Sequence, residues 1–181
     1  MILSDSELVE MLREPRTRRE GFAVLVKQYS EKLYWKVRRI VLSHEDANDV
    51  LQNVFIKVWS NLQNFQGKSS LSTWLYRIAV NESLDFLRKQ KLADKVSADE
   101  DVSVASRLMS DVYFDGDEVQ ARLQEAVARL PEVQRTVFNL KYFEEMKYSE
   151  ISQILNTSEG ALKASYHLAV KKITEYLHLF D

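Results

Sequence analysis

The sequence predicts an all-α protein made of two small helical domains, a helical bundle and a four-helix domain with a helix-turn-helix, joined by an acidic linker. Only four glycines and two prolines occur in 181 residues, too few for the many turns of an all-β fold. Apolar residues recur at steps of three and four through most of the chain, which is the spacing of one helix face. This periodicity fades at residues 92–116, where aspartate, serine and valine dominate. We therefore expect domains at residues 1–91 and 117–181.

The composition argues against several classes of protein. There is no cysteine, and His44, His167 and His178 are scattered, so we expect no disulfide, no metal and no cofactor. No apolar run approaches the ~18 residues that span a bilayer, and the N-terminus is polar and acidic rather than signal-like, so we expect a cytoplasmic protein without direct membrane insertion. No acid–histidine pair, nucleophile elbow or phosphate loop indicates an enzyme, and no catalytic residue is predicted.

The net charge of −2 conceals an uneven distribution along the chain. Residues 27–91 contain eleven Lys/Arg and six Asp/Glu, a balance of +5, whereas residues 92–125 contain three and nine, a balance of −6. A local basic patch can attract a polyanion while the whole chain remains soluble. Two solvated faces without a binding role would give the same counts.

Two helices are expected in the first 42 residues. The first covers Met1–Glu14, where Ser4 and Asp5 can cap the start and Pro15 ends the segment. The second covers Phe22–Leu42. Its apolar side comprises Phe22, Leu25, Val26, Tyr29, Leu33, Val37, Ile40 and Val41, and its opposite side Lys27, Lys32, Lys36, Arg38 and Arg39.

The next helix is expected at residues 44–62. Ser43 offers an N-cap, and Asp46 follows at the third position, where a carboxylate meets free backbone amides. The spacing of the apolar stripe predicts a helix of about five turns. The stripe comprises Ala47, Val50, Leu51, Val54, Phe55, Val58, Trp59 and Leu62, and we expect Phe55 and Trp59 chiefly in the core.

A polar turn at residues 64–70, interrupted by Phe65, leads to a helix that Ser70 or Ser72 can cap. The expected core side of this helix comprises Leu71, Leu75, Ile78 and Leu87. A separate line at i+4 spacing comprises Thr73, Arg77 and Asn81, with Trp74 beside it and Arg88, Lys89 and Lys91 at the end. For Trp74 a place in the core remains an alternative, as does a solvated face for Arg77 and Asn81.

The second domain starts near Asp117, with Pro131 in the first turn of its second helix and Ser149 as the cap of a short third helix. Asn156 tolerates a left-handed turn and Ser158 can cap the last helix. A short helix, a turn of roughly three residues and a longer helix form a helix-turn-helix, although helical hairpins without a DNA-binding role share this spacing. The expected inward residues are Val119, Leu123, Ala126, Val127, Leu130, Val133, Val137, Leu140, Ile151, Ile154, Leu155, Leu162, Ala169, Ile173 and Leu177.

Two separate stretches resemble bacterial RNA polymerase sigma factors of the extracytoplasmic-function group of the sigma-70 family. The run DANDVLQNVFIKVW at residues 46–59 is similar to the polymerase-binding helix of that group, and FQGKSSLSTWLYRIA at residues 65–79 to its promoter-melting segment. Further matches to its C-terminal DNA-binding domain are Leu130-Pro131, Tyr148-Ser149-Glu150-Ile151, and Ser158-Glu159-Gly160 with Lys163. The resemblance covers roughly residues 20–91 and 118–177.

The resemblance implies a transcription initiation factor that binds core RNA polymerase, at its clamp helices and flap, and directs it to promoters. Helix 44–62 would dock on the clamp helices through four residues outside its buried stripe: Asp46, Asp49, Gln52 and Asn53. Without the resemblance, the two aspartates would be explained as charges at a helix N-terminus, worth only ~0.3–1 kcal/mol at an exposed site.

The first domain would also recognise and melt the −10 element. Each extruded base needs a pocket or an aromatic face, and base–aromatic stacking is worth ~1–3 kcal/mol. The turn at residues 64–70 can supply amide, hydroxyl and ammonium groups, the next helix can follow the separated strand, and its basic end can contact phosphates. The implied −10 residues are Asn64, Phe65, Lys68, Ser69, Ser70, Trp74, Arg77, Asn81, Arg88 and Lys89.

The second domain would contact the −35 element with its last helix. The implied residues are Ser158, Glu159, Lys163, Ser165, Tyr166, His167 and Lys171. Where relatives often place arginines, this chain has Ser165 and Leu168. Since arginine makes the commonest bidentate contact to guanine, we expect weaker −35 reading and more weight on phosphate contacts and on residues 64–81.

The resemblance also implies an anti-sigma partner, which in many members is membrane-bound. The acidic linker suggests a further hypothesis, that it occupies a basic channel which polymerase otherwise uses for RNA. Two alternatives remain. One is a helix-turn-helix regulator that binds duplex DNA without polymerase, which leaves residues 43–91 without a role, and the other is a helical interaction protein.

Overall fold

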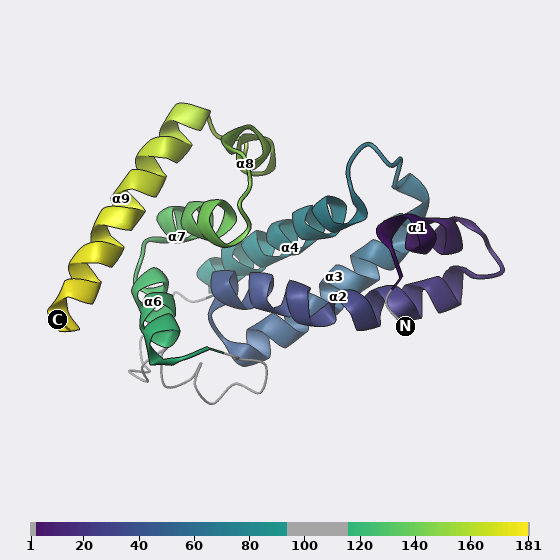
Figure 1. Ribbon diagram of the computed structural model, residues 1–181, viewed down its shortest axis with the longest axis horizontal. Coiled ribbons are helices and arrows are strands. Elements are labelled where there is room, and N and C mark those ends of the chain that lie inside the picture. The colour runs from purple at the N-terminus through teal and green to yellow at the C-terminus, as the bar shows by residue number, and fades with distance from the viewer. Residues whose placement is uncertain (1–2, 94–115, 181) are drawn as a thin grey trace. The chain divides into compact units, whose positions relative to one another are not determined.

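The computed structural model describes residues 3–93 and 116–180, and helices are the only regular secondary structure there (Figure 1). The prediction of an all-α fold is therefore confirmed. Contacts divide the chain into two compact units, one ending at Ala93 and the other following it. Most of the predicted acidic linker, and with it the hypothesis about a basic channel, lies outside the described residues.

The N-terminal unit is a bundle of four helices around α2. In chain order they are α1 (Asp5–Arg13), α2 (Arg18–Val41), α3 (His44–Asn61) and α4 (Leu71–Ala93), with the short 3₁₀ helix η1 (Leu62–Asn64) after α3. Helix α2 packs against α1, α3 and α4, and α3 also packs against α4. The fully buried side chains at the centre include Leu8, Leu25, Leu33, Val37, Val50, Leu71 and Leu75.

Local hydrogen bonds start and end these helices where the sequence indicates. Ser4 forms a capping box with Glu7: its hydroxyl accepts from the Glu7 amide at 3.3 Å, and the Glu7 carboxylate accepts from the Ser4 amide at 2.7 Å. The Ser43 hydroxyl accepts from the Asp46 amide at 3.3 Å and starts α3. Leu42 ends α2 in the left-handed conformation, at φ 68°, which is uncommon for leucine.

The side of α2 that is predicted to lie opposite its apolar stripe is partly buried. Arg38 is only 3% exposed, and Lys36 is half-buried with its Nζ 3.9 Å from the centroid of the Tyr76 ring on α4. Burial, together with the smaller effect of the nearby charges of Arg39 and Lys32, lowers the pKa of Lys36 to about 7. Helix α2 contacts α1, α3 and α4, so its charged residues also meet protein.

The C-terminal unit is organised around its last helix. It comprises α6 (Glu118–Ala128), α7 (Glu132–Phe138), the π-helical turn η2 (Asn139–Phe143), α8 (Tyr148–Leu155), α9 (Glu159–Leu177) and the 3₁₀ turn η3 (His178–Phe180). Helix α9 contacts α6, α7 and α8. Its Ala169 and Ile173 share one buried cluster with Ala126, Val127, Leu130 and Phe138.

Three details of this unit differ from the sequence predictions. Val119 and Val133 were expected inward but are 71% and 62% exposed, because other positions of α6 and α7 turn toward α9. Pro131 directly precedes α7 instead of lying in its first turn. Helix α8 begins one residue before Ser149, and the Glu150 carboxylate closes its start by accepting from the Lys147 amide at 2.9 Å.

We predict that Lys36 makes stability rise with pH. Because the folded protein lowers its pKa from 10.5 to about 7, the unfolded chain binds more protons between these values, and the free energy of unfolding increases over that range. Lys36→Met should lose this increase. Urea unfolding at pH 7 and at pH 10 gives the free energy of unfolding at each pH. Its increase from pH 7 to pH 10 should be smaller in Lys36→Met than in wild type by on the order of 2 kcal/mol, a figure that is discounted for the remaining solvent contact of Lys36.

Lys27→Met is the control, since Lys27 is an exposed lysine of the same helix. It should keep the wild-type pH dependence. If the free energy of unfolding of Lys36→Met changed with pH as that of wild type does, burial of the Lys36 ammonium would have no effect on stability.

Candidate partner-binding and nucleic-acid surfaces

The outer face of α3 is polar, as predicted. Its inner face buries Ala47, Val50, Val54 and Val58 completely or almost completely. The opposite side carries Asp49, Gln52 and Asn53, which are exposed, and Asp46, which is half-buried in the first turn. The structure therefore brings all four predicted polymerase-binding residues to one side of one helix.

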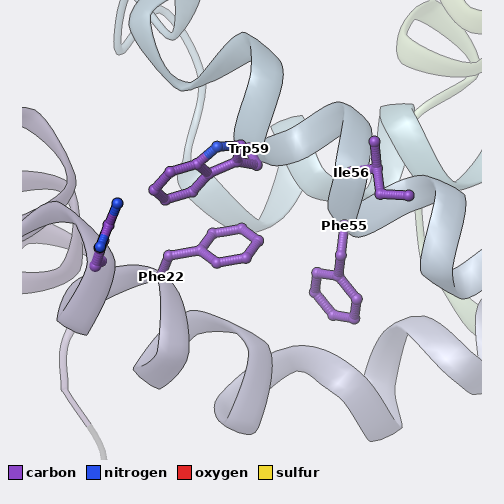
Figure 2. A pocket seen from close by; sticks show the side chains of 5 residues that line it. Phe22, Phe55, Ile56 and Trp59 are labelled. Atoms are coloured by element: carbon purple, nitrogen blue, oxygen red, sulfur yellow. The ribbon is translucent and has the colours of Figure 1, made fainter.

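An apolar pocket continues this face toward the end of α3 (Figure 2). It has a volume of about 380 Å³ and is lined by Arg19, Phe22, Phe55, Ile56 and Trp59. The Phe22 ring from α2 lies edge-on between two rings of α3, with centroids 5.0 Å from Trp59 and 6.4 Å from Phe55. The aromatic rings thus hold each other, while one side of the pocket stays open.

The pocket corrects the expectation that Trp59 is a core residue, because Trp59 is 42% exposed. Ile56 is 63% exposed and is not among the polymerase-binding residues that the sequence predicts. Its signal was present: Ile56 is an apolar residue outside the buried stripe, three and four positions after Asn53 and Gln52 on the polar side. Ile56 joins Phe22, Phe55 and Trp59 in one contiguous apolar patch, and such a patch beside polar residues is typical of a protein-binding surface.

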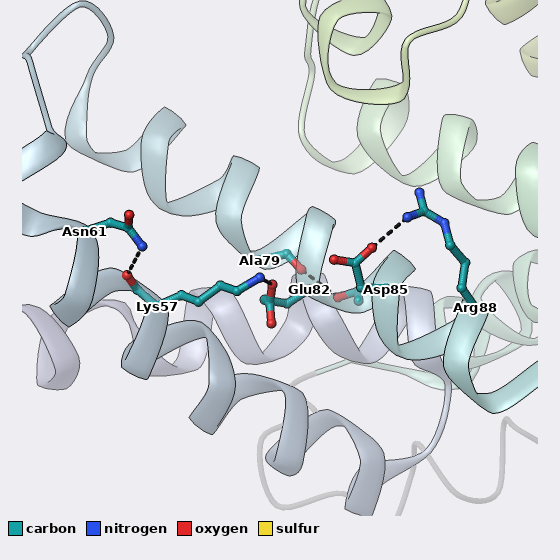
Figure 3. A network of polar contacts seen from close by, with 7 residues as sticks. Lys57, Asn61, Ala79, Glu82, Asp85 and Arg88 are labelled. Carbon is teal, nitrogen blue, oxygen red and sulfur yellow. Dashed lines mark hydrogen bonds and ion pairs between the residues drawn. The ribbon is translucent and has the colours of Figure 1, made fainter. Parts of the chain in front are cut away.

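Polar contacts join α3 to α4 (Figure 3). Lys57 of α3 forms an ion pair with Glu82 of α4, whose side chain is 12% exposed, and the Lys57 carbonyl accepts from the Asn61 amide group at 2.8 Å. Farther along α4, Arg88 pairs with Asp85 at 2.7 Å. Exposed pairs of this kind contribute only about 0–1 kcal/mol, so a phosphate can compete for Arg88.

The loop between η1 and α4 has a defined shape. Gly67 lies at φ +71°, a conformation that L side chains rarely adopt. The Ser70 hydroxyl accepts from the Thr73 amide at 3.1 Å and starts α4, which confirms Ser70 as the cap. Asn64, Lys68 and Ser70 are exposed and Ser69 is half-buried. The loop therefore presents hydroxyl, amide and ammonium groups on a short backbone.

Two aromatic rings meet beside this loop. Phe65 and Trp74 lie with centroids 5.0 Å apart and planes inclined by 46°, and both side chains are half-buried. Trp74 is thus neither in the core nor free in solvent, and an aromatic surface adjoins the polar loop. Along α4, Arg77 is half-buried, whereas Asn81, Arg88 and Lys89 are exposed.

The C-terminal unit contains the predicted helix-turn-helix geometry. Helix α8 is followed by its C-cap Asn156, which has φ 50°, and the Ser158 hydroxyl accepts from the Ala161 amide at 3.3 Å to start α9. Five of the seven residues predicted for DNA contact are exposed: Ser158, Glu159, Lys163, His167 and Lys171. Ser165 and Tyr166 are half-buried.

Tyr166 belongs to a group of aromatic rings under α9. It stacks on Phe138, with centroids 5.7 Å apart and planes inclined by 14°, and burial raises its pKa. Tyr148 meets the Tyr166 ring edge-on at 6.4 Å, and the Lys163 ammonium lies 5.7 Å from the centroid of Tyr148. Tyr166 and Lys163 therefore contribute to the packing of this unit, whatever they contact outside it.

Two further classes of site are absent from the described part of the chain. No group of three or more histidine, aspartate or glutamate residues there could hold a metal ion. None of the helices found there has both the length and the apolar character that a membrane crossing requires.

We predict that Gly67→Ala destabilises the N-terminal unit by about 1 kcal/mol, since a Cβ at this φ is strained. The added atom would also lie 3.4 Å from Arg13 Nη2. Gly160→Ala is the matched control, because a Cβ there meets nothing within 4 Å and alanine favours the helix. In thermal unfolding followed by circular dichroism, the midpoint should shift in opposite directions for the two variants. An unchanged or raised midpoint for Gly67→Ala would show that alanine is not strained at this position.

Comparison with known families matches both units. Residues 25–93 match the family described as Sigma-70 region 2, and residues 120–173 match the family described as Sigma-70, region 4. Among curated relatives, the ECF RNA polymerase sigma factor SigW of Bacillus subtilis is 33% identical over 157 residues, which cover 82% of this chain and 84% of the relative. The RNA polymerase sigma-H factor of Pseudomonas aeruginosa is 30% identical over 182 residues, covering 96% and 93%.

Solved structures share the fold at lower sequence identity. The sigma factor RpoE of Bartonella quintana, solved in complex with the anti-sigma factor NepR, superposes with a TM-score of 0.71 at 20% identity, over 88% of this chain and 98% of that one. CnrH, solved in complex with the cytosolic domain of CnrY, gives a TM-score of 0.64 at 20% identity, over 98% and 96%.

Proposed function

The chain belongs to the extracytoplasmic-function group of the sigma-70 family, and from this premise we propose how its surfaces direct core RNA polymerase to promoters. It is a transcription initiation factor. The alternative of a regulator that binds duplex DNA without polymerase is not favoured, because the region 2 match gives residues 25–93 the role that this alternative lacks.

The observation that carries the −10 assignment is the loop at residues 64–70 beside the Phe65–Trp74 pair. A base that leaves the duplex loses its stacking partners, and an aromatic surface next to polar groups can replace both stacking and base-edge hydrogen bonds. The half-burial of Phe65 and Trp74 supports this role, because each ring is held by the other and still has an exposed part. Asn81, Arg88 and Lys89 would then contact the strand along α4.

We assign the polymerase contact to the outer face of α3 together with the apolar pocket. Asp46, Asp49, Gln52 and Asn53 provide polar contacts for the clamp helices, and Ile56 and Trp59 provide the apolar area that affinity requires. The ring contacts of Phe22 keep this area in place before binding, which reduces the entropy cost of association.

The C-terminal unit would contact the −35 element through α9. The exposed groups Ser158, Lys163, His167 and Lys171 fit contacts to phosphates and base edges. Ser165 and Leu168 offer no guanidinium, so this contact should be modest by itself and depend on tethering to polymerase. Tyr166, which stacks on Phe138, would act by positioning α9, with at most its edge toward DNA.

We also propose an anti-sigma factor as a partner. The solved structures that share the fold include a sigma factor bound by the anti-sigma factor NepR and CnrH bound by a cytosolic domain. The exposed pocket on α3 is a surface that such a protein could cover and so exclude polymerase. We assign no reaction to the chain itself and place its work in the cytoplasm with the polymerase.

The first test adds the purified chain to core RNA polymerase and measures run-off transcripts from genomic promoter fragments. Permanganate mapping of unpaired thymines then compares wild type with Trp74→Ala and Lys68→Ala. Loss of one base–aromatic contact at ~1–3 kcal/mol predicts at least a several-fold decrease in reactivity at the −10 element. Lys27→Met on α2 should react like wild type. Absence of both transcripts and co-elution with core enzyme would refute the function, and unchanged reactivity would refute the −10 assignment alone.

A second test concerns the pocket. Ile56→Asp places a charge in the proposed polymerase contact at a side chain that the fold leaves 63% exposed, so the variant should fold normally. We expect affinity for core polymerase, measured by fluorescence anisotropy, to fall more than tenfold. Val119→Asp makes the same change at an exposed apolar residue of α6 and should have little effect. Equal affinities for the two variants would exclude Ile56 from the contact.

A further inference from the structure

Helix α1 brings a cation to the loop at residues 64–70. Arg13, in the last turn of α1, has its Nη2 atom 3.4 Å from the position that a Cβ of Gly67 would occupy. Helix α1 also contacts η1 and α4, the elements on either side of this loop. The guanidinium therefore lies against the backbone of the loop, although 54 residues separate Arg13 from Gly67 in the chain (67 − 13).

The backbone that carries Arg13 is fixed to α2. The Arg18 guanidinium donates to the carbonyls of Leu12, at 3.0 Å, and Arg13, at 3.3 Å. The Thr17 hydroxyl donates to the Met11 carbonyl at 3.0 Å. Helix α2 passes so close to α1 that a Cβ on Gly21 would lie 2.8 Å from the Met11 Cβ. Arg13 is thus an exposed side chain on a well-anchored support.

The Arg13 guanidinium has hydrogen-bonding capacity left over. Within the described ranges 3–93 and 116–180, it donates to no acceptor and pairs with no carboxylate, and its side chain is exposed. The surrounding segment is basic: residues 13–20 contain four arginines and two glutamates, a balance of +2. Among the groups that a nucleic acid strand presents, the phosphate fits a planar guanidinium with free N–H groups best.

We infer that Arg13 contacts a backbone phosphate of the single strand whose base enters the loop at residues 64–70. This inference rests on the proposed role of that loop. It adds to the site a residue from α1, a helix that lies before the residues matching region 2 of the family. The contact carries no sequence information, and it fixes the strand so that the base reaches the Phe65–Trp74 pair.

The test uses the holoenzyme and a single-stranded oligonucleotide that carries the −10 element of the promoter giving the most run-off transcript. Arg13→Gln should weaken binding about three- to tenfold, and the slope of log affinity against log salt should become shallower by about 0.7, the value for one phosphate contact on a single strand. Arg13→Lys keeps the charge and should restore most of the salt slope. Arg16→Gln removes the same charge from the turn that follows α1, where Arg16 is exposed, and should change neither quantity by as much.

Three outcomes would each refute the Arg13 contact. If Arg13→Gln binds like wild type while Lys68→Ala and Trp74→Ala bind weakly, the Arg13 contact is refuted and the loop assignment stands. If Arg13→Gln and Arg16→Gln lose affinity equally, the effect is the general charge of the turn, and the specific contact is refuted. If neither loop variant changes binding, the role of the loop fails, and the Arg13 inference fails with it. Thermal unfolding of Arg13→Gln confirms that α1 remains folded.

Discussion

The packing of α2 against α1, α3 and α4 is the contact on which the N-terminal unit depends. This helix buries Leu25, Leu33 and Val37 at its centre, and the same packing encloses Arg38 and half-buries Lys36. Enclosing cations costs free energy, which the lowered pKa of Lys36 expresses, and the large apolar area around them offsets that cost. Because α3 and α4 both lie on α2 and are joined by the Lys57–Glu82 ion pair, the surfaces that we propose for polymerase and for DNA have a common support.

That common support matters for promoter opening. A base is held outside the duplex by the favourable free energy of its contacts with the protein. If a mobile loop had to become ordered when the base arrives, the entropy cost of that ordering would reduce this free energy. Here the loop at residues 64–70 is bounded by η1 and by the cap at Ser70, and Gly67 provides the conformation that closes it. The loop therefore has its conformation before a base binds.

The sequence predicts most features that depend on near neighbours in the chain, although not the start of α8, and fails where distant segments decide. The caps Ser4, Ser43 and Ser158 and the left-handed Asn156 are governed by hydrogen bonds within a few residues, so composition and spacing suffice. Trp59 and Arg38 were placed wrongly, because periodicity shows which residues share a face but not how much of that face a neighbouring helix covers. The hydrogen bond of buried Tyr34 to His44 Nδ1, at 2.7 Å between α2 and α3, has no counterpart in a helical pattern. Nor could spacing alone bring Arg13 to Gly67. The −10 and −35 residues remain assignments by resemblance, supported by their exposure.

The placement of the aromatic residues has a spectroscopic consequence. All three tryptophans, Trp35, Trp59 and Trp74, belong to the N-terminal unit, so intrinsic tryptophan emission reports on that unit alone. Trp59 lines the α3 pocket and Trp74 adjoins the loop, in two different environments. A variant that keeps only Trp59 would have its emission at the pocket, and one that keeps only Trp74 would have it at the loop. Their emission after rapid mixing could time polymerase docking and strand capture as separate events.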